Sequence, residues 1–204
     1  NKNINFLKTH SSLCKIYNAN FTDYQNSLGV IYIVRDPRNV VTSMVNHYGY
    51  NIDEATKIIT NEKKFLDKSS KSCSVFVSSW GFNFNSWKEF QKKNKYILVK
   101  YEDLIKRKKT VFIRIFKFFE QLGIKLELDM SKLNMALKST EFEKMKSLEK
   151  KEEFDEALID DKTGKRRIFF NLGPKNDWRK LLDDKNKLII EKTFQKEMLE
   201  LGYL

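Results

Sequence analysis

Hydrophobic and polar residues follow one another in two rhythms along the chain, and the first rhythm indicates buried strands. Short apolar runs occur at residues 29–34, with the sequence GVIYIV, and at residues 95–101, with the sequence KYILVKY. A third candidate strand is INFLKTH, at residues 4–10. Each run is followed by polar residues and then by a helical pattern, and this order is typical of a parallel α/β sheet.

The second rhythm spaces apolar residues three and four positions apart and indicates amphipathic helices. It is clearest in residues 103–123, where positions 111, 112, 115, 116, 118 and 119 would form one helical face before Gly123 ends the helix. Residues 132–158 and 185–204 carry similar patterns, and we expect the final Gly-Tyr-Leu to tuck against the core. With two prolines and seven glycines, the chain has little room for linkers, so we predict one domain over residues 1–204.

The junction after the first strand carries strong helix-start signals. Residues 31–34 end the strand, Asp36 is a good N-cap, and Pro37 suits the first helical turn. Gly49 can stop this helix, whose apolar face would be Val41, Met44, Val45 and Tyr48. Such a helix begins at the carboxyl end of a strand, where parallel sheets bind their ligands.

Arg35 and Ser43 are the candidate binding residues of this junction. Arg35 follows the strand, and Ser43 lies on the helix face opposite the apolar one. A guanidinium at a strand end can form paired bonds to a phosphate, and a helix hydroxyl can add another. The alternative is that Arg35 pairs with Asp36 or a neighbouring acid while Ser43 is merely exposed, and this stretch alone leaves both interpretations open.

The composition is that of a basic globular protein. Apolar residues make up 41% of the 204 residues, and 39 Lys and Arg against 27 Asp and Glu give a formal charge of +12. Such a charge favours polyanions or small phosphorylated ligands, although a solvated lysine-rich surface explains most of it. No apolar run approaches the length of a membrane span.

Cys14 and Cys73 are the only cysteines, and neither belongs to a metal-binding motif. We therefore expect no metal, and two unpaired thiols favour the cytoplasm as the compartment. Because the chain starts at Asn1 and not at a methionine, we expect a natural N-terminal segment upstream, which leaves targeting or anchoring open.

Four ordered stretches together indicate a family. They are FLKTHSSL at residues 6–13, RDPRNVVTS at 35–43, KYILVKYEDL at 95–104, and FFNLGPKNDWRKLL at 169–182, in which Gly173 precedes Trp178 by five residues. In this order and with these spacings, the set resembles the sulfotransferases that use 3′-phosphoadenosine 5′-phosphosulfate (PAPS) as co-substrate. The resemblance runs from about residue 4 to the C-terminus and includes KSTEFEKMK at residues 138–146.

The resemblance implies a fold and a set of site residues. The fold would be the three-layer α/β type of P-loop NTPases, with a central parallel sheet flanked by helices. The resemblance makes His10 the general base that accepts the acceptor's proton, with Lys8 beside it to steady charge on the transferring group. Arg35 and Ser43 would bind the donor's 3′-phosphate, and the remaining donor-binding residues would be Tyr101, Thr140, Phe142 and Gly173.

Two departures separate this chain from the family pattern. The family's phosphate loop, of the type Pro-Lys-Ser-Gly-Thr-Thr-Trp, is missing, and we expect it upstream of Asn1, so that this chain alone would be inactive. In the family pattern Arg and Lys precede the glycine that Gly173 matches, and here Asn171 and Leu172 stand in their place. The lost cations would have to come from elsewhere, with Arg166, Arg167 and Lys175 as candidates.

Three alternatives stay open on the sequence. They are another P-loop-related nucleotide enzyme such as a kinase, a catalytically inactive sulfotransferase-like protein, and a basic domain that binds polyanions. If the chain is a sulfotransferase, we expect a small-molecule or carbohydrate acceptor and no nucleic acid as partner. The acceptor pocket would involve residues 50–79 and 149–168, whose pattern names no substrate, and the oligomeric state is left open.

Overall fold

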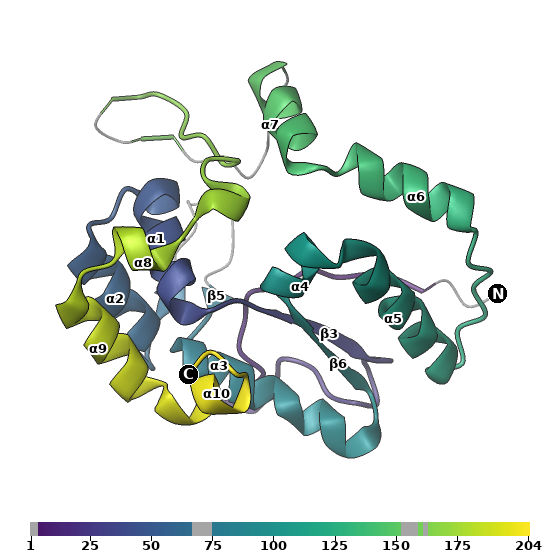
Figure 1. Ribbon diagram of the computed structural model, residues 1–204. Helices are drawn as coiled ribbons and strands as arrows, with labels where there is room; N and C mark the ends of the chain where they lie inside the picture. Colours follow the sequence, from purple (N-terminus) through teal and green to yellow (C-terminus); the bar gives the residue numbers. More distant parts are fainter. Residues whose placement is uncertain (1–3, 67–74, 152–158, 161–162) are drawn as a thin grey trace.

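Two parallel strands form the centre of the molecule. The computed structural model describes residues 4–66, 75–151, 159–160 and 163–204 of the chain. Strands β3 (Val30–Val34) and β6 (Tyr96–Lys100) lie side by side between groups of helices (Figure 1). Both strands fall within one residue of the predicted bounds, because their β-branched and aromatic side chains suit a pleated surface that is covered on both faces.

Alternate residues of this strand pair face opposite helical layers. Ile31, Ile97 and Val99 pack against α5 (Lys108–Gln121), whose buried residues there are Val111 and Ile115. The intervening residues Tyr32, Val34 and Leu98 pack instead against α3 (Trp80–Trp87) and Leu201. Helices therefore cover both faces of the pair, which confirms the predicted three-layer α/β arrangement.

A second core lies beyond the carboxyl end of β3. It joins α1 (Pro37–Tyr48), α2 (Ile52–Thr60), α9 (Asp184–Thr193) and α10 (Gln195–Glu200), and its buried residues are Val41, Ala55, Ile59, Ile190, Phe194 and Met198. Helices α1, α2 and α9 form the group on the left of Figure 1. Helix α1 is thus held in place by segments from the C-terminal end of the chain.

Each of the three longer predicted helices is broken in two. Residues 103–123 fall in α4 (Tyr101–Lys106) and α5, separated by Arg107. Residues 132–158 fall in α6 (Met130–Ser139) and α7 (Phe142–Lys151), with 152–158 outside the described residues. The C-terminal pattern forms α9 and α10, after which Tyr203 packs against the core as predicted.

The predicted strand at residues 4–10 is wrong. No strand of the described part pairs with these residues, and they form no regular element. Their neighbours are held instead by side chains of α3, since Trp87 Nε1 donates to the Ser11 carbonyl at 2.9 Å. The remaining elements are short: β1 (Lys15–Ile16), β2 (Ala19–Asn20), β4 (Phe65–Leu66), β5 (Val75–Phe76), α8 (Trp178–Leu181) and the 3₁₀ turns η1 (Lys88–Lys93) and η2 (Gly173–Lys175).

Candidate functional site

The register of the two parallel strands brings Arg35 and Tyr101 together. Val34 is paired with Lys100, so the next residue of each strand leaves the sheet at the same carboxyl edge. There the Arg35 guanidinium lies over the Tyr101 ring, with Cζ 4.3 Å from the ring centroid. A cation stacked on an aromatic face is held in place without an ion pair. Two residues that sequence analysis placed around one nucleotide are therefore neighbours.

Helix α1 starts where the sequence predicted, and the Asp36 side chain binds the first residues of this helix. Asp36 is the N-cap and accepts the Arg38 backbone N–H at 2.9 Å, Pro37 stands in the first turn, and Gly49 ends the helix in the left-handed conformation. Both carboxylate oxygens of Asp36 also accept from the Arg38 side chain, from Nε at 3.0 Å and from Nη2 at 2.7 Å. The carboxylate of Asp36 therefore forms its ion pair with Arg38, and this observation does not favour the alternative in which Arg35 pairs with Asp36 or a neighbouring acid.

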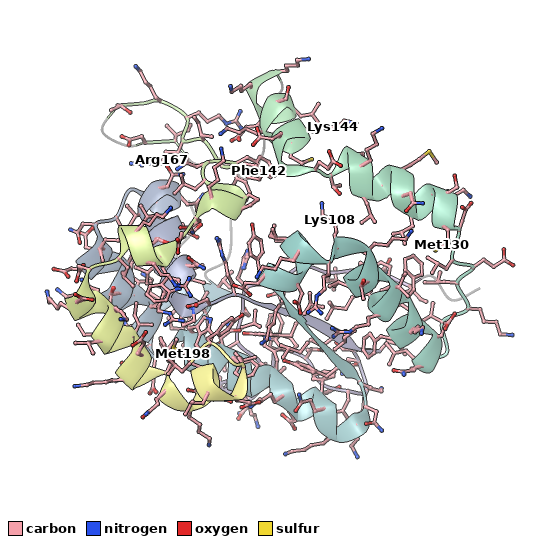
Figure 2. The ribbon with its side chains drawn as sticks, viewed as in Figure 1. Lys108, Met130, Phe142, Lys144, Arg167 and Met198 are labelled. Atoms are coloured by element: carbon pink, nitrogen blue, oxygen red, sulfur yellow. The ribbon has the colours of Figure 1, made fainter. Side chains whose placement is uncertain are left out.

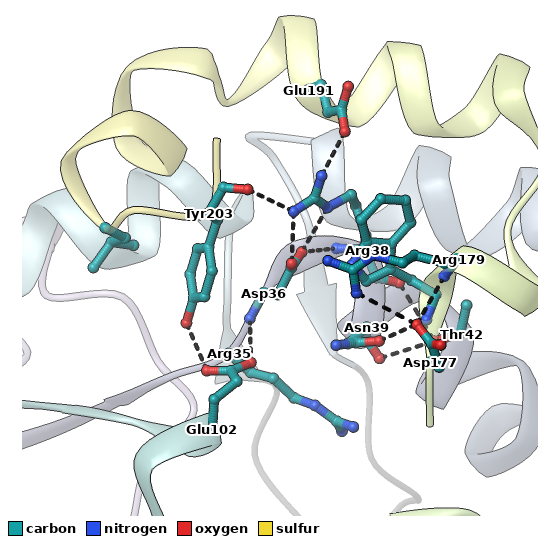
Figure 3. A network of polar contacts seen from close by, with 12 residues as sticks. Arg35, Asp36, Arg38, Asn39, Thr42, Glu102, Asp177, Arg179, Glu191 and Tyr203 are labelled. Carbon is teal, nitrogen blue, oxygen red and sulfur yellow. Dashed lines mark hydrogen bonds and ion pairs between the residues drawn. The ribbon is translucent and has the colours of Figure 1, made fainter. Parts of the chain in front are cut away.

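The Arg35 side chain turns away from the carboxylates beside it. Figure 3 shows its side chain directed away from the carboxylates of Asp36 and Glu102. Its Nε atom is buried and has no hydrogen-bond partner. Burial lowers the pKa of Arg35, and the nearby Tyr101 and Glu102 partly offset this change, but a guanidinium stays charged at neutral pH. A buried donor without an acceptor is costly, so this arrangement fits a ligand oxygen such as that of a phosphate.

Arg38, which sequence analysis did not single out, organises the protein behind Arg35. Its guanidinium is buried and also donates to Glu191 Oε1 at 2.5 Å and to the Tyr203 carbonyl at 2.8 Å (Figure 3). The Tyr203 hydroxyl in turn donates to Glu102, which accepts the Asp36 backbone N–H at 3.1 Å. This network joins the ends of β3 and β6 to the C-terminal residues, and the second arginine of the Arg-Asp-Pro-Arg motif thus has a structural role.

The Asn-Asp-Trp stretch docks on α1 and so positions Gly173. Asn176 accepts the Thr42 hydroxyl at 2.7 Å and donates to the Asn39 carbonyl at 2.9 Å. Its own backbone N–H closes the η2 turn by donating to the Gly173 carbonyl at 3.1 Å. Ser43 is partly buried and lies one helical turn after Asn39, on the same side of α1. The turn that carries Gly173 therefore sits against the helix face that bears Ser43.

Gly173 and Phe142 are in close contact. Gly173 has a φ of +50°, and a Cβ atom built on it would lie 2.1 Å from Phe142 Cε2. Figure 2 shows Phe142 at the start of α7, beside the segment that carries η2. A hollow of about 210 Å³ borders this contact and is lined by Glu141, Phe142, Glu143, Leu172, Pro174 and Lys175. Two more of the predicted nucleotide contacts are thus brought together.

Thr140 lies at the junction of α6 and α7, two residues before Phe142. Its carbonyl accepts from Lys108 Nζ at 3.1 Å, at the start of α5. Lys108 follows α4, the helix that begins with Tyr101. The candidate adenine-binding residues therefore come from two neighbouring parts of the fold.

His10 and Lys8 are exposed residues of the N-terminal segment. Asn83 Nδ2 donates to the His10 carbonyl at 3.1 Å, and Trp80, one turn earlier on α3, donates from Nε1 to the Arg35 carbonyl at 3.2 Å. One helical turn spans ~5.4 Å, so α3 fastens the backbones of His10 and Arg35 near each other. The catalytic roles of His10 and Lys8 stay predictions.

The candidate replacements for the lost cations differ in position. Arg167 pairs with Asp160 and donates to the Asn46 carbonyl at 3.4 Å, near the C-terminal end of α1 and far along that helix from Arg35. Arg166 is exposed in the same stretch, and Lys175 is exposed in the η2 turn. Neither the ion pair of Arg167 nor its place supports a role at the Arg35 end of the site.

The described part of the chain contains no group of three or more His, Cys, Asp or Glu residues arranged to hold a metal ion. Cys14 is a free thiol whose pKa is raised by burial, and Cys73 lies outside the described residues. Within the same described ranges, every helix is too short or too polar to cross a membrane.

The fold is that of an α/β protein in which a strand-end arginine and a helix start lie at the carboxyl edge of the parallel pair. A family model described as a sulfotransferase domain matches residues 1–202, so the chain belongs to the sulfotransferase domain family. The family resemblance seen in the sequence is thereby confirmed.

Individual relatives agree with this assignment. The chain is 27% identical over 180 residues to Sulfotransferase 2A1 of Macaca fascicularis, covering 87% of this chain and 59% of that protein. It is 23% identical over 178 residues to the amine sulfotransferase of Oryctolagus cuniculus, covering 85% of this chain and 55% of that protein. The chain therefore spans less than two thirds of the length of these curated relatives.

Two solved structures share the fold. Mouse sulfotransferase SULT7A1 complexed with PAP matches with a TM-score of 0.59 and 22% identity, covering 83% of this chain and 58% of that one. Retinol dehydratase in a complex with retinol and PAP matches with a TM-score of 0.58 and 19% identity, covering 83% and 47%.

Proposed function

We propose that this chain provides the nucleotide site and the general base of a sulfotransferase that transfers the sulfuryl group of PAPS to a hydroxyl or an amine. The observation that carries the proposal is Arg35, a charged side chain at the carboxyl edge of the sheet, stacked on Tyr101 with a buried, unpartnered N–H. The PAP complexes of the two structural neighbours support it, since PAP, 3′-phosphoadenosine 5′-phosphate, is PAPS without the sulfuryl group.

The nucleotide would be fixed by residues from four segments. Arg35 and Ser43 bind the 3′-phosphate, one by charge-assisted hydrogen bonds and the other through its hydroxyl. The adenine lies among aromatic and polar residues of α4 and of the junction between α6 and α7, and the Gly173 backbone N–H adds a donor to the 3′-phosphate. The adenine-facing residues are Tyr101, Thr140 and Phe142.

In the reaction, the acceptor oxygen or nitrogen forms a bond to sulfur while the bond between sulfur and the bridging phosphate oxygen breaks. His10 takes the proton that the acceptor loses, and the leaving phosphate oxygen keeps the electron pair of the broken bond. Lys8 stabilises negative charge on the transferring group. As in phosphoryl transfer, in-line positioning and electrostatic stabilisation supply most of the rate, so the protein's cations replace a metal ion.

The acceptor we propose is a small molecule or a carbohydrate. The relatives' names support a small acceptor, because they include an amine sulfotransferase and a 3-beta-hydroxysteroid sulfotransferase of Cavia porcellus. We propose the cytoplasm as the compartment, because a chain with only two cysteines and no disulfide framework suits a reducing environment.

The donor site is tested with Arg35→Gln in the full-length protein. We expect the KM for PAPS to rise by roughly ten- to a hundredfold, as for a lost charge-assisted contact of about 1.5–3 kcal/mol, with the acceptor's KM unchanged. Arg107→Gln is the matched control, because Arg107 is exposed and pairs with Asp103. Tight binding of ATP with magnesium, without binding of PAP, would instead favour a kinase-like enzyme.

The base is tested with His10→Ala. We expect kcat to fall by about a hundredfold or more and the acidic limb of its pH profile to disappear, at unchanged thermal stability because His10 is exposed. His47→Ala is the control, since His47 packs against Tyr48 and Phe169 with ring centroids 4.5 and 5.4 Å away. That control should lose stability and keep its kcat. An unchanged kcat in His10→Ala removes His10 from the mechanism.

A further inference from the structure

Helix α7 lies antiparallel to the segment at residues 169–173 and is clamped to it at both ends. At one end the Glu149 carboxylate accepts the backbone N–H groups of Phe169 at 2.6 Å and of Phe170 at 2.9 Å. At the other end the Phe142 ring packs against Gly173. Because these contacts stand on one face of α7, the segment is held in a defined register along the helix.

Lys146 stands between the two clamps, on the same face of α7. Its Nζ atom donates to the Asn171 carbonyl at 3.3 Å and lies 5.9 Å from the centroid of the Phe142 ring. The side chain is partly buried, unlike the exposed side chain of Lys144 on the same helix (Figure 2). An ammonium group has three N–H donors, and the carbonyl uses one of them. Two donors and the full charge remain for another ligand.

The position of this ammonium matters because of what the facing segment lacks. Asn171 and Leu172 stand where the family pattern has Arg and Lys, so the segment before Gly173 carries no charge of its own. A phosphate dianion held by one arginine and neutral donors alone would be poorly neutralised. The alignment of α7 with residues 169–173 places the positive charge of Lys146, which belongs to a different element, beside Asn171.

We propose that Lys146 is a binding residue for the 3′-phosphate of the nucleotide and takes over the electrostatic part of the missing Arg-Lys pair. This inference rests on the proposed function, since it concerns the same nucleotide site. The Glu149 clamp and the Asn171 carbonyl make Lys146 pre-organised, which lowers the entropy lost when a long side chain binds a ligand. The site thereby keeps its charge although the motif has lost it.

The test compares two nucleotides that differ only in the 3′-phosphate. The affinities of the purified full-length protein for PAP and for adenosine 5′-phosphate are measured by calorimetry at one fixed salt concentration. In Lys146→Gln the affinity for PAP should fall about tenfold while that for adenosine 5′-phosphate stays the same. Lys146→Arg should keep most of the PAP affinity, and the exposed Lys144→Gln should bind both nucleotides like the wild type.

The outcomes separate this inference from the function on which it rests. If the wild type does not prefer PAP over adenosine 5′-phosphate, the proposed function fails and the inference fails with it. If the wild type prefers PAP and Lys146→Gln keeps that preference, only the role of Lys146 is overturned. If Lys146→Gln weakens both nucleotides equally, Lys146 has a structural role, and the inference is again overturned.

Discussion

Replacing Arg38 by leucine tests whether the second arginine of the Arg-Asp-Pro-Arg motif holds the fold together. Its side chain is 5% exposed, and its guanidinium faces Asp36, whose side chain is 7% exposed, and Glu191, whose side chain is 19% exposed. Hydrogen bonds to these two carboxylates raise the pKa of Arg38 although burial alone would lower it. Leucine would leave the Asp36 carboxylate buried without its counter-charge.

The size of the effect follows from these partners. Removing one member of a buried ion pair costs about 3–5 kcal/mol. The N-cap bond from the residue-38 backbone to Asp36 survives the substitution and favours the lower end of that range. The lost contact with the Trp178 ring, 3.9 Å from Arg38 Cζ, adds about 0.5–2 kcal/mol. We therefore expect the free energy of unfolding to fall by about 4 kcal/mol.

Urea unfolding followed by tryptophan fluorescence and circular dichroism measures this change. With a urea slope of about 2 kcal/mol per molar, the midpoint of Arg38→Leu should move down by about 2 M. Arg38→Lys should fall in between, because it keeps the charge and loses the two-pronged geometry. Arg35→Leu is the matched control and should move the midpoint by less than about 0.5 M. Equal midpoints for the two leucine variants would refute the division of roles between the arginines.

Two further predictions concern glycine packing and acid sensitivity. Gly173→Ala should push Phe142 away and lower PAP affinity by roughly tenfold in calorimetry. The control is Gly164, which has a similar φ of +64° and where a Cβ atom built on the glycine would meet nothing within 4 Å. Gly164→Ala therefore reports backbone strain alone and should leave the affinity unchanged. The pKa of Asp183 is lowered mainly by a backbone N–H at the start of α9, so its contribution to stability is present above the ordinary pKa of about 3.9 and is lost as pH falls through the lowered value. Asp183→Asn should therefore lose less stability than the wild type between pH 7 and pH 3 in urea titrations, and an equal loss would contradict this cause.

Local signals in the sequence were sufficient for the elements around the site. Short apolar runs predicted β3 and β6, and Asp36, Pro37 and Gly49 predicted both ends of α1. These features depend on the preferences of a few neighbouring residues. The helix breaks at Arg107 and Thr140 were not predicted, because the charged residues on both sides of each break are compatible with one continuous helix.

Contacts between distant segments could not be read from the sequence. Arg38 meets Glu191, 153 positions later, and Lys146 meets Asn171 across a reversal of the chain. Such pairs depend on how whole helices dock, which no local pattern encodes. The strand expected at residues 4–10 failed for the same reason: a strand needs a partner strand, and within the described ranges this segment meets side chains of α3 and α5 instead.

The register of the parallel pair is what converts two separate motifs into one site. Side chains alternate between the faces of a strand, so a shift of β6 by one residue against β3 would turn its buried side chains toward the wrong layer. The packing of Val34 toward α3 and of Val99 toward α5 therefore fixes which residues stand at the strand ends. Arg35 meets Tyr101 because the observed register pairs Val34 with Lys100, and a shift by one residue would turn the apolar side chains of β6 to the wrong faces. The position of the charged group is thus set by the hydrophobic core beneath it, while the Asp36 carboxylate beside it is engaged by Arg38.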